Sequence, residues 1–145
     1  MDPQETLVAG CKILETILIP SGFTFVEGAS GKGSGGFFAS GKFIKGNRAL
    51  ELHFRHSLGL VTYHIGGLSL THEAYMRAAL GPREKNKYPG FSNDPLDAFR
   101  DLASDLRNFC VDFLDGSGEQ FAKYVESARE YNDLSGIRKL SNNES

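Results

Sequence analysis

The first part of the chain repeats its apolar side chains with the period of an α-helix. A single stripe contains Leu7, Cys11, Leu14 and Leu18. This spacing is typical of a helix that buries one face. Pro3 suits a first helical turn and Pro20 follows the last apolar residues. The pattern predicts a helix from Pro3 to Ile19.

The period then changes from that of a helix to that of a strand. In the stretch 49–56, "ALELHFRH", apolar and polar residues alternate, as in a strand with one buried and one solvated face. The alternation holds from residue 36 to residue 65, and "FTFVE" at 23–27 predicts one strand more. Four antiparallel strands are expected.

Turn chemistry sets the expected register of these strands. Gly46 and Asn47 form a two-residue hairpin signal that pairs Lys42 with Glu51. A turn at 56–59 would pair Leu52 with Tyr63 and align His64 with Glu51. Both registers place the apolar residues on one face, namely Leu50, Leu52, Phe54, Val61, Tyr63 and Ile65.

Helical spacing returns after residue 67 and predicts three C-terminal helices, at 71–80, 95–115 and 118–131. We therefore expect one α+β domain over residues 1–145: an N-terminal helix, a four-stranded antiparallel meander, and three C-terminal helices packed on one face of the sheet. The glycine-rich stretch 28–36 is expected to be a mobile loop, and the tail from about residue 141 to be disordered.

Residues 36–42, "GFFASGK", nearly match the phosphate-binding loop of nucleotide-binding proteins. Phe43 stands where that pattern needs a hydroxyl for magnesium. A phosphate loop also requires a helix directly after the lysine, because the N-terminus of that helix holds the phosphate. Gly41 and Lys42 fall within a predicted strand instead, so we do not expect a nucleotide site.

The solvated face of the predicted sheet collects the polar side chains that could carry chemistry. Glu51, His53 and His64 supply the two imidazoles and one carboxylate of a non-haem iron site. Lys42 beside them would disfavour a cation. Ser40 opposite His53 resembles a nucleophile and its base, but a serine inside a strand has no oxyanion hole.

Recognition of a partner is the favoured interpretation of this face. The candidate partner-binding residues are Lys42, Glu51, His53, Arg55 and His64. Arg55 can pair with an anionic group while it stacks on Phe38 in the neighbouring strand. A solvated sheet exterior without a ligand is the alternative.

Four further residues have simpler expected roles. His56 and His72 fall near a turn and a helix start, which favours surface or capping positions over catalysis. Tyr88 and Phe91, in the segment "YPGF", are expected to anchor a long loop over the core.

Composition narrows the function classes. With 16 Lys and Arg against 18 Asp and Glu, the net charge of −2 offers no global attraction for nucleic acid. No apolar run spans a bilayer and no secretory leader is recognisable, so a cytoplasmic protein is expected. Cys11 and Cys110 occupy apolar helical positions, which predicts buried free thiols. No metal-binding cysteine spacing is present, and no cofactor is expected.

The element order carries one resemblance. A helix ending in "IPSGF" at 19–23, a glycine-rich link, a meander and C-terminal helices resemble small bacterial α+β domains, among which toxin-immunity proteins are found. The resemblance implies a non-enzymatic protein that binds a protein partner. The alternative is a small enzyme, metal-dependent or metal-free, that uses Glu51, His53 and His64.

Overall fold

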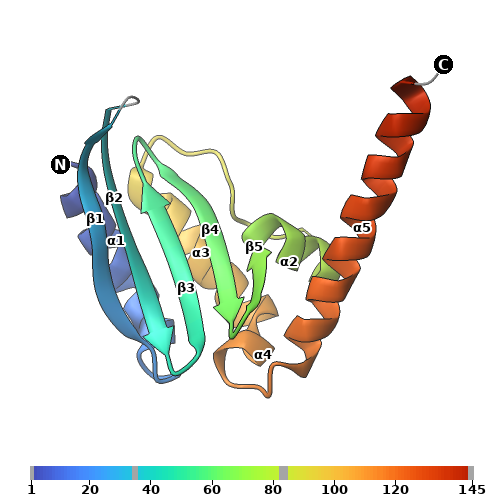
Figure 1. Cartoon of the computed structure of the whole chain (residues 1–145). Coiled ribbons are helices and arrows are strands. Elements are labelled where there is room, and N and C mark those ends of the chain that lie inside the picture. Colours follow the sequence, from blue (N-terminus) through green and yellow to red (C-terminus); the bar gives the residue numbers. More distant parts are fainter. Residues whose placement is uncertain (1, 34–35, 82–84, 144–145) are drawn as a thin grey trace.

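The computed structural model describes residues 2–33, 36–81 and 85–143. Helices and strands follow one another as a helix, an antiparallel meander and further helices (Figure 1). In order they are α1 (Pro3–Leu18), β1 (Thr24–Gly33), β2 (Gly36–Lys45), β3 (Arg48–Phe54), β4 (Leu58–Ile65), β5 (Leu68–Thr71), α2 (His72–Leu80), α3 (Pro95–Phe109), α4 (Val111–Leu114) and α5 (Glu119–Asn143).

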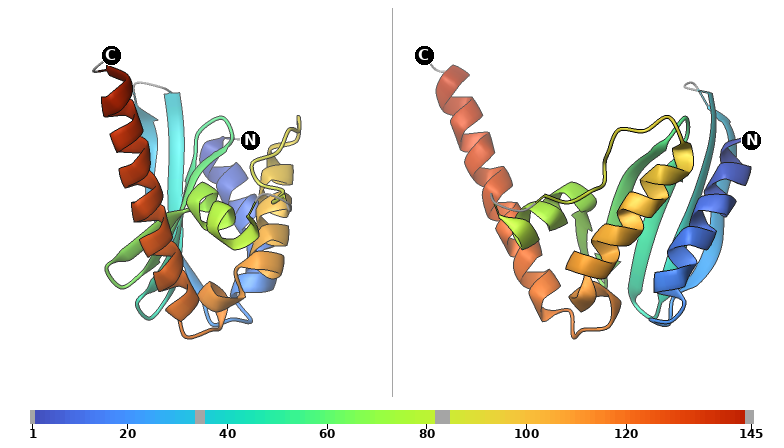
Figure 2. Two further views of the ribbon diagram at one scale, coloured as in Figure 1. Left: turned by 90° about the vertical axis from the view of Figure 1, so that its right-hand side faces the viewer. Right: turned by 180° about the vertical axis from the view of Figure 1, so that it is seen from behind.

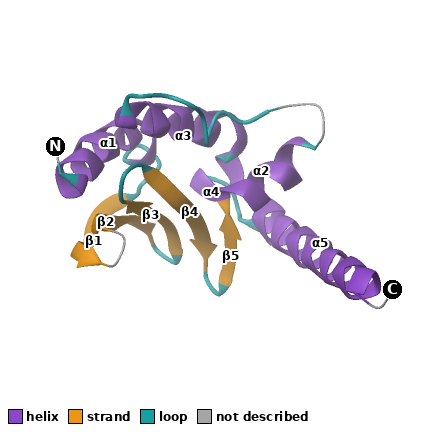
Figure 3. Ribbon diagram, turned by 90° about the horizontal axis from the view of Figure 1, so that it is seen from above, coloured by secondary structure: helices purple, strands orange, loops and turns teal. Residues whose placement is uncertain are grey.

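The molecule has an α+β architecture in which one face of the sheet is covered by helices. The five strands lie in the order β1-β2-β3-β4-β5. Helices α1 and α3 lie side by side over one face, whereas no described helix crosses the other face (Figures 2 and 3). Helix α2 packs beside β4 and β5, and the C-terminal end of α5 projects away from the rest of the molecule.

Helix α1 forms as the sequence predicts. Asp2 caps its N-terminus by accepting a hydrogen bond from the backbone N–H of Glu5 at 2.8 Å. The predicted apolar stripe is buried against the sheet. The backbone then turns at Gly22, whose φ of 98° favours glycine.

The register between β2 and β3 is confirmed. Lys42 pairs with Glu51, and Gly46 makes the turn with a φ of 57°. Gly41 and Lys42 lie inside β2 without a helix after them, as the rejection of a phosphate loop requires. The space over Gly41 is occupied by Phe25 of β1, whose ring carbons would lie 2.6 Å from an added Cβ.

The predicted register between β3 and β4 is wrong by two residues. Leu52 pairs with Val61 instead of Tyr63, and Phe54 pairs with Leu58 across a register shift. Leu58, expected in the turn, is a buried core residue of β4, so the turn is shorter than predicted. Because the shift is even, the apolar side chains keep their face. Ile65 is partly buried, and the other five predicted residues are buried.

Two expectations about the sheet are corrected at its edges. Residues 28–33, expected to be a loop, continue strand β1 as far as Gly33, with a bulge between Glu27 and Ser30. Residues 34 and 35 of that stretch lie outside the described residues. A fifth strand, β5, pairs with the end of β4 and was not predicted. The alternation of apolar and polar residues in this strand is too short to predict a strand from the sequence alone.

The C-terminal helices also differ from their predicted bounds. The long helix expected at 95–115 breaks at Cys110, which separates α3 from the short α4. Helix α5, expected to end near Tyr131, continues to Asn143, so residues 141–143 of the expected disordered tail are helical. Residues 144 and 145 lie outside the described residues.

The core lies between the sheet and the helices and contains both cysteines as buried free thiols, as predicted. Burial raises the pKa of each thiol from 9.0 to about 12. Within the described part of the chain, no helix combines the length and the apolar character that a membrane span requires.

Candidate functional site

The open face of the sheet, defined here by Lys42, Glu51, His53, Arg55 and His64, is not crossed by any helix that the structure describes (Figure 1). Strand β2 supplies Lys42, β3 supplies Glu51 and His53, and β4 supplies His64. Arg55 lies in the bend directly after β3. The side chain of His53 is 52% exposed, whereas those of Glu51 and His64 are 29% and 32% exposed. All five side chains are therefore accessible in part or in full.

The predicted row that aligned Lys42, Glu51 and His64 does not form. Glu51 pairs across to Thr62, and His64 lies opposite Ala49 in the next row. The cause is the two-residue register difference between β3 and β4. His64 nevertheless reaches Glu51 on the diagonal, as long side chains on neighbouring rows can.

The Glu51 carboxylate lies between both imidazoles of the open face. Its Oε1 is 3.3 Å from Nε2 of His64, and its Oε2 is 3.9 Å from Nε2 of His53. The Nδ1 of His64 forms a further hydrogen bond with the hydroxyl of Ser69 at 2.7 Å. Glu51 and Ser69 therefore hold the His64 ring by hydrogen bonds, whereas His53 only lies near the negative charge of Glu51.

The two catalytic interpretations of this face gain no support. Among the described residues, no three His, Cys, Asp or Glu side chains are placed to hold a metal ion. Ser40 donates its hydroxyl to the carbonyl oxygen of Ala29 at 3.1 Å. A serine that is bonded to backbone inside a strand lacks the exposed turn that presents a nucleophile.

Arg55 and Phe38 make the contact that the sequence predicts. The guanidinium carbon lies 5.8 Å from the centroid of the Phe38 ring. This distance is within the range of a cation–π interaction. The ring covers one side of the guanidinium, whose N–H groups point along its edge and can form planar hydrogen bonds.

A buried polar network, absent from the predictions, lies beneath α2. His72 was expected at the surface or in a cap, but it is 3% exposed. Its Nδ1 bonds to the hydroxyl of Tyr63 at 2.7 Å, and its Nε2 bonds to Asp105 at 3.0 Å. Asp105 itself is completely buried. The network thus connects the sheet, α2 and α3.

Asp105 also fastens the segment that precedes α3. Its carboxylate accepts hydrogen bonds from the backbone N–H groups of Lys87 and Tyr88 at 2.7 and 2.8 Å. The hydroxyl of Tyr88 bonds to the carbonyl oxygens of Leu58 and Gly59 in β4. Tyr88 is therefore the buried anchor that the sequence predicts, whereas the prediction for Phe91 is wrong because that ring is fully exposed.

The network has the parts of a proton relay, but the described residues place no reacting group at either end of it. Both nitrogens of His72 are engaged, and the Cys110 thiol lies 3.7 Å from the Tyr63 hydroxyl in the core. Burial raises the pKa of Tyr63 well above its ordinary value, so this hydroxyl stays protonated at neutral pH. We interpret the network as a structural one that satisfies buried polar groups.

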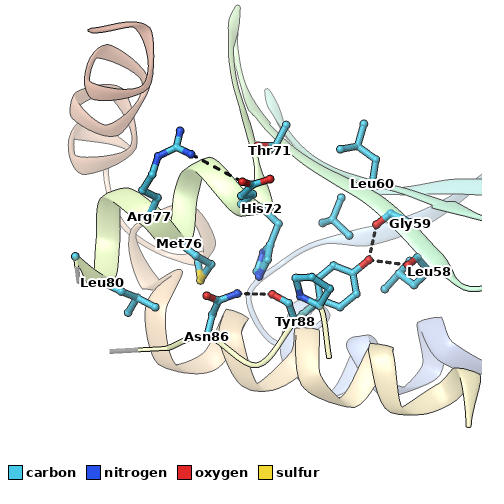
Figure 4. Close-up of a pocket in the computed structure, with 14 residues that line it drawn as sticks. Leu58, Gly59, Leu60, Thr71, His72, Met76, Arg77, Leu80, Asn86 and Tyr88 are labelled. Atoms are coloured by element: carbon cyan, nitrogen blue, oxygen red, sulfur yellow. Dashed lines mark hydrogen bonds and ion pairs between the residues drawn. The ribbon is translucent and has the colours of Figure 1, made fainter. Parts of the chain in front are cut away.

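A hollow of about 660 Å³ lies between β4, α2 and the segment around Tyr88 (Figure 4). Its wall is largely apolar and includes Leu58, Leu60, Met76 and Leu80. His72 contributes to the wall, and Arg77 lies at the α2 side of the hollow. This volume is within the usual range of small-molecule pockets, about 300–1,000 Å³.

Sequence reasoning missed this region because its parts come from separate segments. Asp105 stands within an otherwise apolar stripe of α3, beside Leu102 and Leu106. A carboxylate at a core position needs buried partners, and this was the only signal available. His72 could not be identified as its partner, since 33 positions separate the two residues.

Comparisons with protein-family models, curated proteins and solved structures found no match to the chain. The function therefore has to be argued from the side chains and their arrangement.

Proposed function

We propose that the chain is a binding protein that recognises an acidic surface of a protein partner through the open face. The arrangement of Arg55 on Phe38 is the observation that supports this most directly. Arginine and aromatic residues are enriched at the energetic centres of interfaces. A guanidinium held against a ring also loses less freedom on binding than a free side chain.

The charge of the open face differs from that of the whole chain. The chain has a net charge of −2. On the open face, Lys42 and Arg55 oppose one carboxylate, Glu51, which lies against two imidazoles. The accessible charge is therefore positive, and it complements carboxylates on a partner.

Apolar side chains flank these charges. Val26 is 49% exposed and pairs with Lys42, and the half-buried Phe38 lies four residues before Lys42 in β2. Both side chains are therefore on the same face of the sheet as Lys42. Interfaces combine such apolar contacts with a charged periphery. An immunity-like role, in which the partner is a toxin, is the form of this proposal that the sequence resemblance suggests, and the cytoplasm is its proposed location.

The experiment uses the purified protein to capture a partner from the source cells. Arg55→Ala should weaken the captured partner's affinity by about 1–3 kcal/mol, a change of roughly 5- to 150-fold. Thermal stability should hardly change, because the removed side chain is at the surface. Lys12→Ala, on the exposed side of α1, is the matched control and should bind like the wild type.

Two results would count against the open face. A partner that binds Arg55→Ala and His53→Ala as tightly as the wild type must contact another surface. An affinity that does not fall with increasing salt would contradict an acidic partner, because exposed charge pairs are screened.

A further inference from the structure

The floor of the hollow beside α2 is rigid because its side chains are fixed from behind. Val61, Met76 and Tyr88 are at most 5% exposed. Tyr88 is held by two carbonyl oxygens of β4, and His72 is held between Tyr63 and Asp105. A hollow bounded by such fixed groups keeps its shape without a ligand, which lowers the entropic penalty of binding.

Most polar atoms of the floor are already engaged. Both ring nitrogens of His72 have partners, and the Tyr88 hydroxyl donates to backbone. Thr71 uses its hydroxyl to cap α2 through the N–H of Ala74 at 3.2 Å. Apart from the hydroxyl proton of Thr71, these floor groups have their hydrogen-bonding atoms engaged, so the part of the ligand that fills the hollow is expected to be mainly apolar.

Arg77 gives the α2 side of the hollow an oriented cation. Its guanidinium carbon lies 3.9 Å from the centroid of the Tyr131 ring, and its side chain is 38% exposed. The ion pair with Glu73 is long, at 4.0 Å, and the Glu73 side chain is 88% exposed. Such a solvated ion pair contributes little energy. The N–H groups at the edge of the guanidinium can therefore donate hydrogen bonds to a ligand carboxylate in place of Glu73.

We propose that this hollow is a binding site for an amphipathic carboxylic acid of medium chain length. The apolar chain of the ligand lies on Leu58, Met76 and Leu80, and its carboxylate pairs with Arg77. The volume of about 660 Å³ accommodates a ligand of this size. This site is independent of the open face and of the proposed protein partner.

Decanoate is the probe that tests the proposal. It is titrated into the whole protein below its critical micelle concentration, and binding is followed by the amide chemical shifts of the protein. Saturable shifts should appear in α2, in β4 around Leu60 and around Tyr88. Decanol has the same chain without the charge and should bind about tenfold more weakly, a difference of about 1.4 kcal/mol. Equal binding of the two compounds would overturn the role of Arg77.

Two variants separate the charge from the hollow. Arg77→Met should weaken decanoate binding about tenfold, whereas Arg100→Met, which removes a cation paired with Asp94 and Asp97 on α3, should leave it unchanged. Leu80→Trp should fill the hollow and abolish binding. If that variant does not fold, Leu60→Trp serves the same purpose. Leu60 is 60% exposed, so a larger side chain there does not have to fit into the core.

The absence of saturable shifts in the wild type would overturn the proposal. Decanoate affinity that is unchanged in folded Arg77→Met and Leu80→Trp would also overturn it, since the ligand would then lie elsewhere. Neither result bears on the protein partner, which is tested separately through Arg55.

Discussion

At the scale of single residues, Asp105 links α3 to α2 and to the segment that precedes α3. Its fully buried carboxylate accepts from His72 and from two backbone N–H groups. A buried carboxylate is tolerated only where such donors compensate for its lost hydration. One side chain thereby determines the position of α2, of the segment before α3 and of Tyr88.

Asp105→Asn should lower the free energy of unfolding by about 1–3 kcal/mol. The amide retains one acceptor oxygen, but its NH₂ group would face N–H donors. Urea denaturation measures the change. Asp101→Asn, one turn earlier on the same helix, is the matched control and should change stability by less than about 0.5 kcal/mol. Equal effects in the two variants would mean that the network contributes nothing specific.

At the scale of elements, the approach of α1 to α3 depends on Gly10. A Cβ at this position would lie 2.4 Å from carbons of the Phe99 ring. Phe99 in turn stacks on Phe54 of β3, with ring centroids 6.2 Å apart. The ring therefore fills the junction of both helices and the sheet, and the glycine allows the helices to pack at this distance.

Gly10→Ala should destabilise the protein, although alanine is the better helix former. Its helical preference is worth up to about 1 kcal/mol, but overpacking a core typically costs about 1–3 kcal/mol. The net loss of stability is measurable by thermal unfolding. Gly67→Ala, with open space around the added methyl and no positive φ, should be nearly neutral. A stabilised Gly10→Ala variant would show that α1 and α3 can separate at little cost.

At the scale of the whole molecule, the core holds weak acids in their protonated forms. Burial raises the pKa of Cys11, Cys110 and Tyr88 to about 12, and it raises that of Tyr63 and Tyr75 as well. Above pH 9.0, the ordinary value of a thiol, the unfolded chain releases protons that the native state keeps. Stability must therefore fall as pH rises through this window.

Denaturation between about pH 8 and about pH 11 should show this fall, with each thiol contributing up to about 1.4 kcal/mol per pH unit above its unfolded pKa. In Cys11→Ala, the free energy of unfolding should fall less steeply with pH, by the contribution of one thiol. The slopes are compared instead of the stabilities, because the lost side chain lowers stability at every pH. Parallel curves for the variant and the wild type would contradict a buried neutral thiol at Cys11.

Local patterns in the sequence determined the type of most elements and the faces of the sheet. Neighbouring residues alone determine three of these features: the apolar stripe of α1, the turn at Gly46 and the alternation of apolar and polar residues in β3. The candidate residues of the open face could be identified for the same reason, since alternation assigns each side chain to one face. Even a register error of two residues left this assignment intact.

Only the tertiary structure decided the features that depend on distant packing partners. The core position of Leu58 set the register of β4, and the break at Cys110 separated α3 from α4. The pairing of His72 with Asp105 and the hollow beside α2 required segments far apart in the chain to meet. Periodicity reports which side of an element is buried, but it carries no information about which residue lies opposite, because that choice depends on how the core fills its volume.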